Sequence, residues 1–380
     1  MSKPSRAWAA LPCALLLACG GGGGSNEYAP GEDGGRALDK PPGAAPTVTL
    51  SPPDTGDGWE VSTPDAQAMD VGRLEQALNT LRTQGSDGMD GIVVVRNDRL
   101  VAEAYYNGYD RSTIHDVRSV TKSITSALAG IAIDRGIIGL EDSIAQHVPN
   151  FERYPVDDQK RAIRISHLLN MQSGLDCDDG VDSSPGNESR MYGKDDWVNF
   201  TLSLSMTAVP GTRMAYCSAG VMLLGHIIAA RSGMKLEDFA AAYLFGPLSI
   251  QNVRWMHSPQ GVTNANSTFQ IRPRDAAKLG TLYLNGGRWK GQSVVPESWV
   301  TRSFTRTGAM RGEGYGWLWW KTSFLVRGVV QPVLYASGNG GNLIFVLPTE
   351  QLVVVITASN YNQSSPSYAF MRDVILPTVR

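Results

Sequence analysis

The spacing of apolar residues changes along this chain, and each spacing predicts a different kind of element. From Val71 to Gln84 the apolar residues recur on one helical face, which predicts a helix. Two β-rich runs, Gly91 to Arg96 and Leu100 to Tyr106, flank turn-forming residues and predict a β-hairpin. The predicted folded part therefore begins with a helix followed by a hairpin.

The middle of the chain has a helical pattern, and its end returns to strands. Helices are predicted over 122–135, 197–204, 219–231 and 274–284, strands over 316–321, 329–335, 343–347 and 352–357, and a last helix over about 366–375. This order most simply places both ends of the chain in one antiparallel sheet flanked by the terminal helices, with the helical middle as an inserted all-helical lobe. The predicted fold class is α/β in the α+β sense, with a cleft between sheet and lobe.

The first residues have the pattern of an export signal. A basic start precedes an apolar stretch over 7–17, and the small residue Ala18 precedes Cys19. Residues 16–20 resemble a bacterial lipobox, in which the cysteine sulfur is acylated and the cysteine becomes the new N-terminus. We expect a signal peptide over 1–18 and an exported bacterial lipoprotein, held to a membrane by lipid on Cys19 and facing the periplasm or the cell exterior. The alternative is an ordinary secretory signal that is cut elsewhere.

The composition after Cys19 changes at about residue 60. Glycine, proline, alanine and polar residues dominate 19–60, which predicts a flexible tether because such a segment buries too little apolar surface to order itself. Residues 61–380 are expected to fold. We expect their sheet part at about 61–118 and 288–380 and their helical lobe at about 119–287.

Charge and composition argue against several classes of function. The 34 Lys and Arg nearly balance the 36 Asp and Glu, and no long basic run is present, which argues against a nucleic-acid partner. Apolar stretches beyond the N-terminus are shorter than the roughly 18 residues of a membrane helix. Five histidines and four cysteines stand in no metal-like cluster, so we expect neither a metal site nor an organic cofactor.

The segment Arg118 to Lys122 carries a candidate for nucleophilic catalysis at the start of an apolar helix. Ser119 and Lys122 are three apart and share one helical face. A lysine whose pKa is lowered by its surroundings can take a serine proton, and the helix N-terminus favours the oxyanion that follows. The alternative is a helix-capping serine followed by a solvated lysine.

Two later segments carry groups that suit the same chemistry. Tyr216 follows a turn-rich approach, and a tyrosine beside a lysine can serve as general base and general acid; the alternative is a core tyrosine. Residues 338–342 are rich in glycine and lead into a strand, so their N–H groups can approach a ligand and complete an oxyanion hole. The alternative is a plain hairpin turn.

In this order, Ser119-x-x-Lys122, Tyr216-Cys217-Ser218 and the glycine-rich edge 338–342 resemble the motif set of the serine β-lactamase and penicillin-recognising superfamily. The resemblance is to its class C-like branch, which includes family VIII carboxylesterases and nylon-oligomer hydrolases, and it covers roughly residues 65–380. It implies a β-lactamase/transpeptidase-like fold, an antiparallel sheet with an all-helical lobe, in agreement with the predicted layout.

The resemblance also implies a role for each matching residue. Ser119 would be the acylated nucleophile, Lys122 its proton partner and Tyr216 the acid/base, while the backbone N–H of Ser119 and one near Asn342 would form the oxyanion hole. The candidates on the substrate and oxyanion side are Ser218, Asn339, Gly341 and Asn342.

Two positions depart from the family pattern. Ser218 stands where the family often has asparagine two residues after the tyrosine, and Asn339-Gly340-Gly341 stands where β-lactamases have Lys-Thr-Gly. The second departure removes the cation that would pair with the carboxylate of a penicillin or a D-Ala-D-Ala peptide. Lys321-Thr322-Ser323 lacks the glycine and is not a substitute. We expect an exported serine hydrolase that acts on a small-molecule ester or amide through an acyl-enzyme; the alternatives are a β-lactamase or D-Ala-specific peptidase, and a non-catalytic cell-wall binding module.

Cys177 and Cys217 are the only cysteines in the part that is expected to fold. In an exported protein such a pair predicts a disulfide, which here would join the acidic loop 176–179 to the residue after Tyr216. The alternative is two free buried thiols.

Overall fold

A computed structural model of the protein describes residues 43–380, so the predicted signal peptide and Cys19 lie outside the described residues. Two parts of the chain supply the strands of one large sheet: β1 (Thr47–Thr49), β2 (Glu60–Val61), β3 (Met89–Arg96), β4 (Arg99–Tyr105), β10 (Gly308–Met310), β11 (Glu313–Gly316), β12 (Trp319–Val326), β13 (Val329–Gly338), β14 (Asn342–Leu347) and β15 (Leu352–Ala358). The strand order is β1-β4-β3-β15-β14-β13-β12-β11-β10, with β2 beside β4. Only the β2–β4 pair of this sheet is parallel. The prediction that both ends of the chain share one antiparallel sheet is confirmed.

The centre of the sheet is covered by helices on both faces, which explains its continuous apolar runs. Every residue of β14 and β15 is buried. Ile344 lies against Gly280 of the helix α9 (Pro273–Leu284), while its neighbour Phe345 contacts Tyr368 of α11 (Ser367–Phe370) with ring centroids 5.6 Å apart. Since neighbouring strand residues point to opposite faces, α9 and α11 cover different faces of the sheet.

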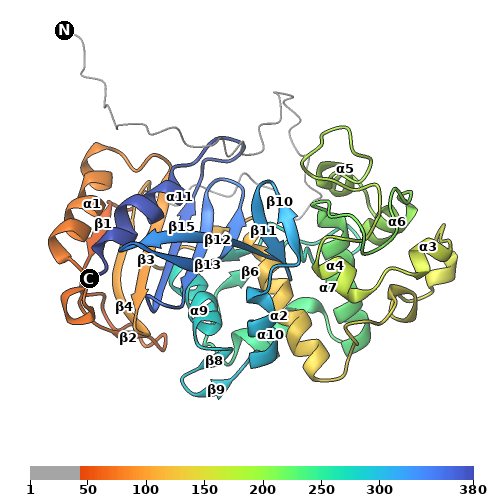
Figure 1. Ribbon diagram of the computed structural model, residues 1–380, viewed down its shortest axis with the longest axis horizontal. Coiled ribbons are helices and arrows are strands. Elements are labelled where there is room, and N and C mark those ends of the chain that lie inside the picture. Colours follow the sequence, from red (N-terminus) through yellow and green to blue (C-terminus); the bar gives the residue numbers. More distant parts are fainter. Residues whose placement is uncertain (1–42) are drawn as a thin grey trace, which may run out of the picture.

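Most of the other regular elements of the described chain are helices. They are α1 (Val71–Gln84), α2 (Val120–Asp134), α3 (Asp158–Arg161), α4 (Ile165–Leu169), α5 (Glu188–Tyr192), α6 (Trp197–Ser203), α7 (Ser218–Ser232), α8 (Leu236–Ala240) and α10 (Glu297–Phe304), besides α9 and α11. Short strands β5 (His115–Asp116), β6 (Val253–Arg254) and β7 (Gln270–Ile271) form a second sheet, and β8 (Arg288–Trp289) pairs with β9 (Gln292–Ser293). Figure 1 shows α3 to α7 gathered at the right, beyond the edge of the sheet, as the predicted lobe requires.

The lobe is smaller than the predicted span of 119–287. The helix α9 packs on β3, β14 and β15 and so belongs with the sheet. Gly280 allows this packing of α9 on the sheet. A Cβ at this position would lie 2.9 Å from Ile344 Cγ2, so glycine lets the helix approach the strands closely.

The expected tether over 19–60 is wrong for its described part, residues 43–60. The strand β1 pairs with β4 at the sheet edge. Arg274 forms an ion pair with Asp57 (2.8 Å), and the Trp59 indole donates to the Arg274 carbonyl (3.1 Å). Arg274 is almost fully buried and also pairs with Glu103 (3.1 Å), so Asp57 is one of two carboxylates that balance its charge, and the segment that carries Asp57 is held in place.

The expected strand over 316–321 is also wrong, because a tight turn divides it into the end of β11 and the start of β12. Trp317 and Leu318 both adopt left-handed backbone angles (φ +57° and +61°). Tryptophan and leucine rarely adopt such angles, so the sequence does not predict this turn. Contacts from the lobe hold the turn: the Leu318 N–H donates to the Leu169 carbonyl (3.0 Å), and the Trp317 N–H donates to Asn170 Oδ1 (3.0 Å). This aromatic hairpin therefore ties the sheet to the lobe.

Candidate active site

The start of α2 places a serine and a lysine on one face of the helix, as their spacing predicts. Ser119 is the residue before the helix, and Lys122 is almost fully buried in its first turn. Ser119 Oγ lies 3.0 Å from Lys122 Nζ. The preceding residue, Arg118, has a left-handed backbone (φ +49°), an unfavourable conformation for a residue with a Cβ. Strain at this point is typical of a residue held in place for a function.

The lysine is held by a carbonyl group as well as by the serine. Lys122 Nζ donates to the backbone carbonyl of Asn266 (2.9 Å). The side chain of Asn264 accepts the N–H groups of Asn266 and Ser267, both at 3.1 Å, and so fixes the turn that presents this carbonyl. The position of the amine is therefore set by two elements of the lobe.

Tyr216 lies beside the lysine at the start of α7. Lys122 Nζ is 4.9 Å from the centroid of the Tyr216 ring. The opposite wall of the site is aromatic: Trp320 of β12 stacks on Tyr216 with centroids 5.9 Å apart, and Tyr315 of β11 meets it edge-on at 6.1 Å. Three segments that are far apart in the sequence thus bring a hydroxyl, an amine and a phenol ring together.

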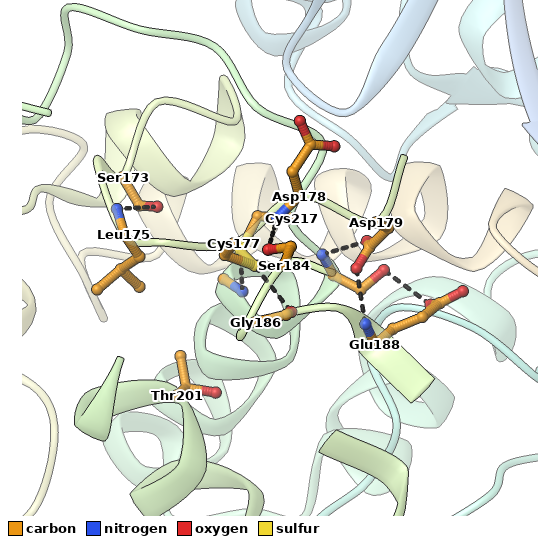
Figure 2. Close-up of a disulfide and its surroundings, with 12 residues drawn as sticks. Ser173, Leu175, Cys177, Asp178, Asp179, Ser184, Gly186, Glu188, Thr201 and Cys217 are labelled. Atoms are coloured by element: carbon orange, nitrogen blue, oxygen red, sulfur yellow. Dashed lines mark hydrogen bonds between the residues drawn. A yellow bond between two sulfur atoms is a disulfide. The ribbon is translucent and has the colours of Figure 1, made fainter. Parts of the chain in front are cut away.

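The structure joins Cys177 to Cys217 by a disulfide with their Cα atoms 5.3 Å apart. Figure 2 shows this bond between the acidic loop and the start of α7. Since Cys217 follows Tyr216 directly, the bond ties the tyrosine to the loop, and the Asp179 N–H donates to the Tyr216 carbonyl (2.8 Å) as a second tie.

The glycine-rich edge 338–342 meets the nucleophile through Gly338, its first residue, rather than through Asn339, Gly341 or Asn342. A Cβ on Gly338 would lie 3.1 Å from the Ser119 backbone nitrogen and would collide with the Val117 carbonyl. Only glycine lets β13 pass this close to the start of α2. If Gly338 matches the glycine of the Lys-Thr-Gly motif, Ala336 stands at the position of the motif's lysine. A cation is absent at this position too.

The remaining sequence candidates on this edge hold the turn together. Asn342 is fully buried; its side-chain amide donates to the carbonyls of Asn339 (2.8 Å) and Ala358 (3.1 Å). The Asn339 side chain pairs with Asn362, and the left-handed Gly341 (φ +93°) leaves room for Ser365. No contact of the described structure brings the side chain of Asn339 or Asn342 to Ser119.

Ser218 bonds to acidic residues rather than to Ser119 or Lys122 in the described structure. Its hydroxyl donates to Glu188 Oε2 (2.9 Å), and its N–H donates to Asp179 Oδ2 (2.8 Å). Asp179 belongs to the acidic loop that the sequence predicts beside Tyr216, but its bond to Ser218 was not predicted. Glu188 was not singled out at all, because it is distant from Tyr216 along the chain.

A cation that the sequence also did not reveal stands at the turn between β10 and β11. The Arg311 guanidinium lies 5.3 Å from the centroid of the Tyr216 ring. A Cβ on Gly180 would lie 2.9 Å from Arg311 Nη2, so the arginine reaches from the sheet to the acidic loop. A positive charge is thus present at the tyrosine although the strand β13 carries none.

Within residues 43–380, no group of three or more His, Cys, Asp or Glu side chains is placed to hold a metal ion. Over the same residues, no helix combines the length and the apolar character needed to span a bilayer.

The chain is similar in sequence to known proteins. A family model described as Beta-lactamase matches residues 73–379. The chain is 27% identical to a 6-aminohexanoate-dimer hydrolase of Paenarthrobacter ureafaciens over 72% of its own length and 69% of the relative. Other curated relatives, among them a penicillin-binding protein 4 of Amycolatopsis lactamdurans, are matched over about two fifths of their own length.

Solved structures show the same fold. A penicillin-binding protein homologue from Caulobacter crescentus aligns with a TM-score of 0.65 at 14% identity, over 87% of this chain and 100% of the other. A family VIII carboxylesterase aligns with a TM-score of 0.63, also at 14% identity, over 80% of this chain and 96% of the other. The predicted fold, an antiparallel sheet with a helical lobe, is therefore confirmed.

Proposed function

The chain belongs to the beta-lactamase family, and on this premise we propose that it is a serine hydrolase that forms an acyl-enzyme on Ser119. The observation that carries the proposal is the meeting of Ser119, Lys122 and Tyr216 at the start of two lobe helices. A serine hydroxyl is a weak nucleophile until a neighbouring base accepts its proton, and the amine 3.0 Å away is such a base when neutral.

In the first half of the proposed reaction the proton of Ser119 moves to Lys122 while Oγ bonds to the substrate carbonyl carbon. The carbonyl oxygen becomes an oxyanion at the N-terminus of α2, where the helix dipole and the Ser119 N–H stabilise it. Since Gly338 brings the end of β13 to this point, we assign the second oxyanion donor to the N–H of Asn339, which follows it, rather than to one near Asn342.

In the second half the tetrahedral intermediate collapses and the acyl-enzyme is hydrolysed. Tyr216, placed beside Lys122, delivers a proton to the leaving alcohol or amine as the bond to it breaks. Water then attacks the acyl-enzyme, the pair Lys122 and Tyr216 accepts its proton, and Ser119 regains a proton as the acid product leaves. Protons and electrons balance without a metal or an organic cofactor.

We propose small esters or amides as the substrate class, as expected from the sequence. Two relatives named above are a 6-aminohexanoate-dimer hydrolase and a family VIII carboxylesterase. Neither Ala336 nor Asn339, the two positions at which the motif's lysine could stand, offers the cation that a β-lactam carboxylate needs. The runner-up is a β-lactamase or D-Ala-specific peptidase, in which Arg311 would supply the missing charge from another strand pair.

We also propose that the protein is exported and held to a membrane through lipid on Cys19. The support is the basic and apolar start followed by the lipobox-like residues 16–20. Metabolic labelling with a fatty acid tests this: wild type should incorporate label and Cys19→Ala should not.

The reaction is tested with a fluorophosphonate probe and mass spectrometry of the labelled peptide. We expect one adduct, on Ser119, which is absent in Ser119→Ala and retained in Ser112→Ala, a change of an exposed serine. A panel of short-chain esters, amides and nitrocefin then ranks substrates. Nitrocefin turnover equal to ester turnover would favour the lactamase, while an unreactive protein that binds cell-wall fragments would favour a binding module.

A further inference from the structure

Two carboxyl groups, those of Asp179 and Glu188, lie close together near Tyr216. Neither belongs to the proposed reacting groups Ser119, Lys122 and Tyr216. Asp179 lies in the loop that the disulfide ties to α7, and Glu188 begins the helix α5. The Glu188 N–H donates to Asp179 Oδ1 (2.8 Å), as Figure 2 shows beside the disulfide. Both residues keep part of their surface exposed, but Asp179 Oδ1, Asp179 Oδ2 and Glu188 Oε2 all accept hydrogen bonds from the protein.

Ser218 joins the two carboxyl groups. Its N–H donates to Asp179 Oδ2 at 2.8 Å, and its hydroxyl donates to Glu188 Oε2 at 2.9 Å. The Asp179 N–H in turn donates to the carbonyl of Tyr216. Ser218, which stands where the family often has asparagine, is therefore the centre of a cluster that holds the backbone of Tyr216.

A second path of hydrogen bonds joins the same cluster to the lysine. The Tyr192 hydroxyl donates to Glu188 Oε2 (3.2 Å), and the Asn266 side-chain amide donates to the Tyr192 hydroxyl (2.7 Å). The Asn266 carbonyl accepts from Lys122 Nζ (2.9 Å). Both members of the proposed acid–base pair, Tyr216 and Lys122, are thus connected to these two carboxyl groups.

The charges around the pair favour a neutral Asp179 in mildly acidic solution. Burial, and then the charge of Glu188, raise the pKa of Asp179 to about 7, while the charge of Lys122 and the bonds from Ser218 act in the opposite direction. Burial also keeps the pKa of Tyr192 well above its usual value, so this tyrosine stays neutral. The other titratable groups facing the pair are Tyr216 and Arg311, the latter close to Gly180.

We propose that Asp179 and Glu188 hold one proton between them and that this proton controls the charge of Lys122, with Ser218 as the positioning residue that joins the pair to Tyr216. The inference deepens the proposed function and rests on it. When the pair releases its proton to solvent, the second negative charge favours the ammonium form of Lys122, and an ammonium group cannot accept the proton of Ser119.

The test measures the rate of Ser119 labelling by a fluorophosphonate from pH 5.5 to 8.5 in wild type, Glu188→Gln and Asp179→Asn. In this reaction the Ser119 oxygen bonds to phosphorus, fluoride leaves and the serine proton passes to Lys122, so the rate reports the neutral amine. Glutamine keeps an oxygen that can accept from Ser218 and Tyr192, so this variant removes the charge with little change of shape.

The quantity to compare is the ratio of variant rate to wild-type rate at each pH. Above pH 7 the wild type carries two carboxylates and each variant only one, so both ratios should rise by about threefold or more between pH 5.5 and 8.5. At pH 5.5 the wild-type pair and each variant carry one carboxylate, so both ratios should start near one. A uniform loss caused by altered packing lowers a ratio at every pH and leaves it flat.

Asp182→Asn is the matched control, since this carboxyl is exposed in the same loop, and its ratio should stay flat. Flat ratios for both Glu188→Gln and Asp179→Asn, with Ser119 still labelled, would overturn the pair's role and leave the serine hydrolase intact. A wild type that is not labelled at Ser119 would instead overturn the proposed function. If Asp179→Asn does not fold, Glu188→Gln alone decides.

Discussion

The two walls of the candidate site, one from the lobe and one from the sheet, differ in the kind of group that they contribute. The lobe wall contributes groups that gain and lose protons: Ser119, Lys122 and Tyr216, with Asp179 and Glu188 behind them. The sheet wall contributes closely packed rings and a strand edge, with Trp320 and Gly338 as its nearest points.

This difference suggests a division of labour between the walls. Groups on the lobe wall sit at helix starts, where a hydrogen bond can form or break without moving a strand. The rings on the sheet wall are fixed by their neighbours: Trp320 contacts Tyr315, Tyr335 and Tyr216 within about 6 Å. We therefore expect changes on the lobe wall to alter rate and pH dependence, and changes on the sheet wall to alter fit.

The largest effect is expected from Lys122→Ala on the lobe wall. Removing the base from the proposed nucleophile should reduce kcat on an ester by at least ~10² while the fold is kept. Steady-state kinetics with circular dichroism as a check on folding measures this. A variant that keeps near-normal turnover would remove the lysine from the role of base and break the division between the walls.

Gly338→Ala tests the point at which the sheet wall contacts the nucleophile, where we expect an exception to the division. The added methyl meets the Val117 carbonyl, a backbone group that cannot move aside without shifting Ser119. We expect kcat to fall by about 10-fold to 10²-fold, because a displacement of about 1 Å at reacting groups is that costly. Gly193→Ala is the control, since its Cβ would have 3.8 Å to the nearest atom; equal effects of the two changes would contradict a special role for Gly338.

The sequence predicted the lobe wall better than the sheet wall for a physical reason. The spacing of Ser119 and Lys122 is local, so one turn of helix is enough to bring them together. The positions of Gly338, Arg311 and Asp179 depend on how distant segments pack, and no local pattern carries that information. The turn at Trp317 is of the same kind, because contacts from the lobe stabilise a backbone that its residues do not favour.

The fold was predicted within the same limit: local spacing predicted elements, and contacts between distant segments were missed. Periodicity placed α1, α2, α6, α7, α9, the C-terminal helix and most strands of the sheet, since apolar spacing reflects burial of each element. It missed the helices α3, α4, α5, α8 and α10. It missed β1 and the ordered residues up to Trp59, because their anchor is an ion pair between Asp57 and Arg274, which are distant in sequence. Composition rich in proline and polar residues therefore predicted a tether where the structure has a sheet edge.

A smaller effect should appear in stability, through the raised pKa of Asp179. The folded protein keeps this proton up to about pH 7, whereas an unfolded chain releases it near 3.8. Raising the pH through that window therefore favours the unfolded chain, and the contribution of Asp179 to stability falls until about pH 7. The Tm of Asp179→Asn minus the Tm of wild type should rise by about 2–4 °C from pH 5 to pH 8 in thermal melts; a difference that is constant or falls with pH would contradict the raised pKa.

The smallest effect, and the one that best sharpens the comparison, is expected from Arg311→Ala. Arg311 is a charged group on the sheet wall that reaches across to Tyr216 and the acidic loop, so it belongs to neither kind of wall alone. If it selects substrates by charge, its loss should raise KM for an ester that bears a carboxylate by about threefold to tenfold and leave kcat within about twofold. The matched neutral ester should be unaffected, and Arg311→Lys, which keeps the charge without the planar fork, should lie between. A fall in kcat for both esters would instead place Arg311 with the lobe wall, as a group that acts on the charge of Tyr216.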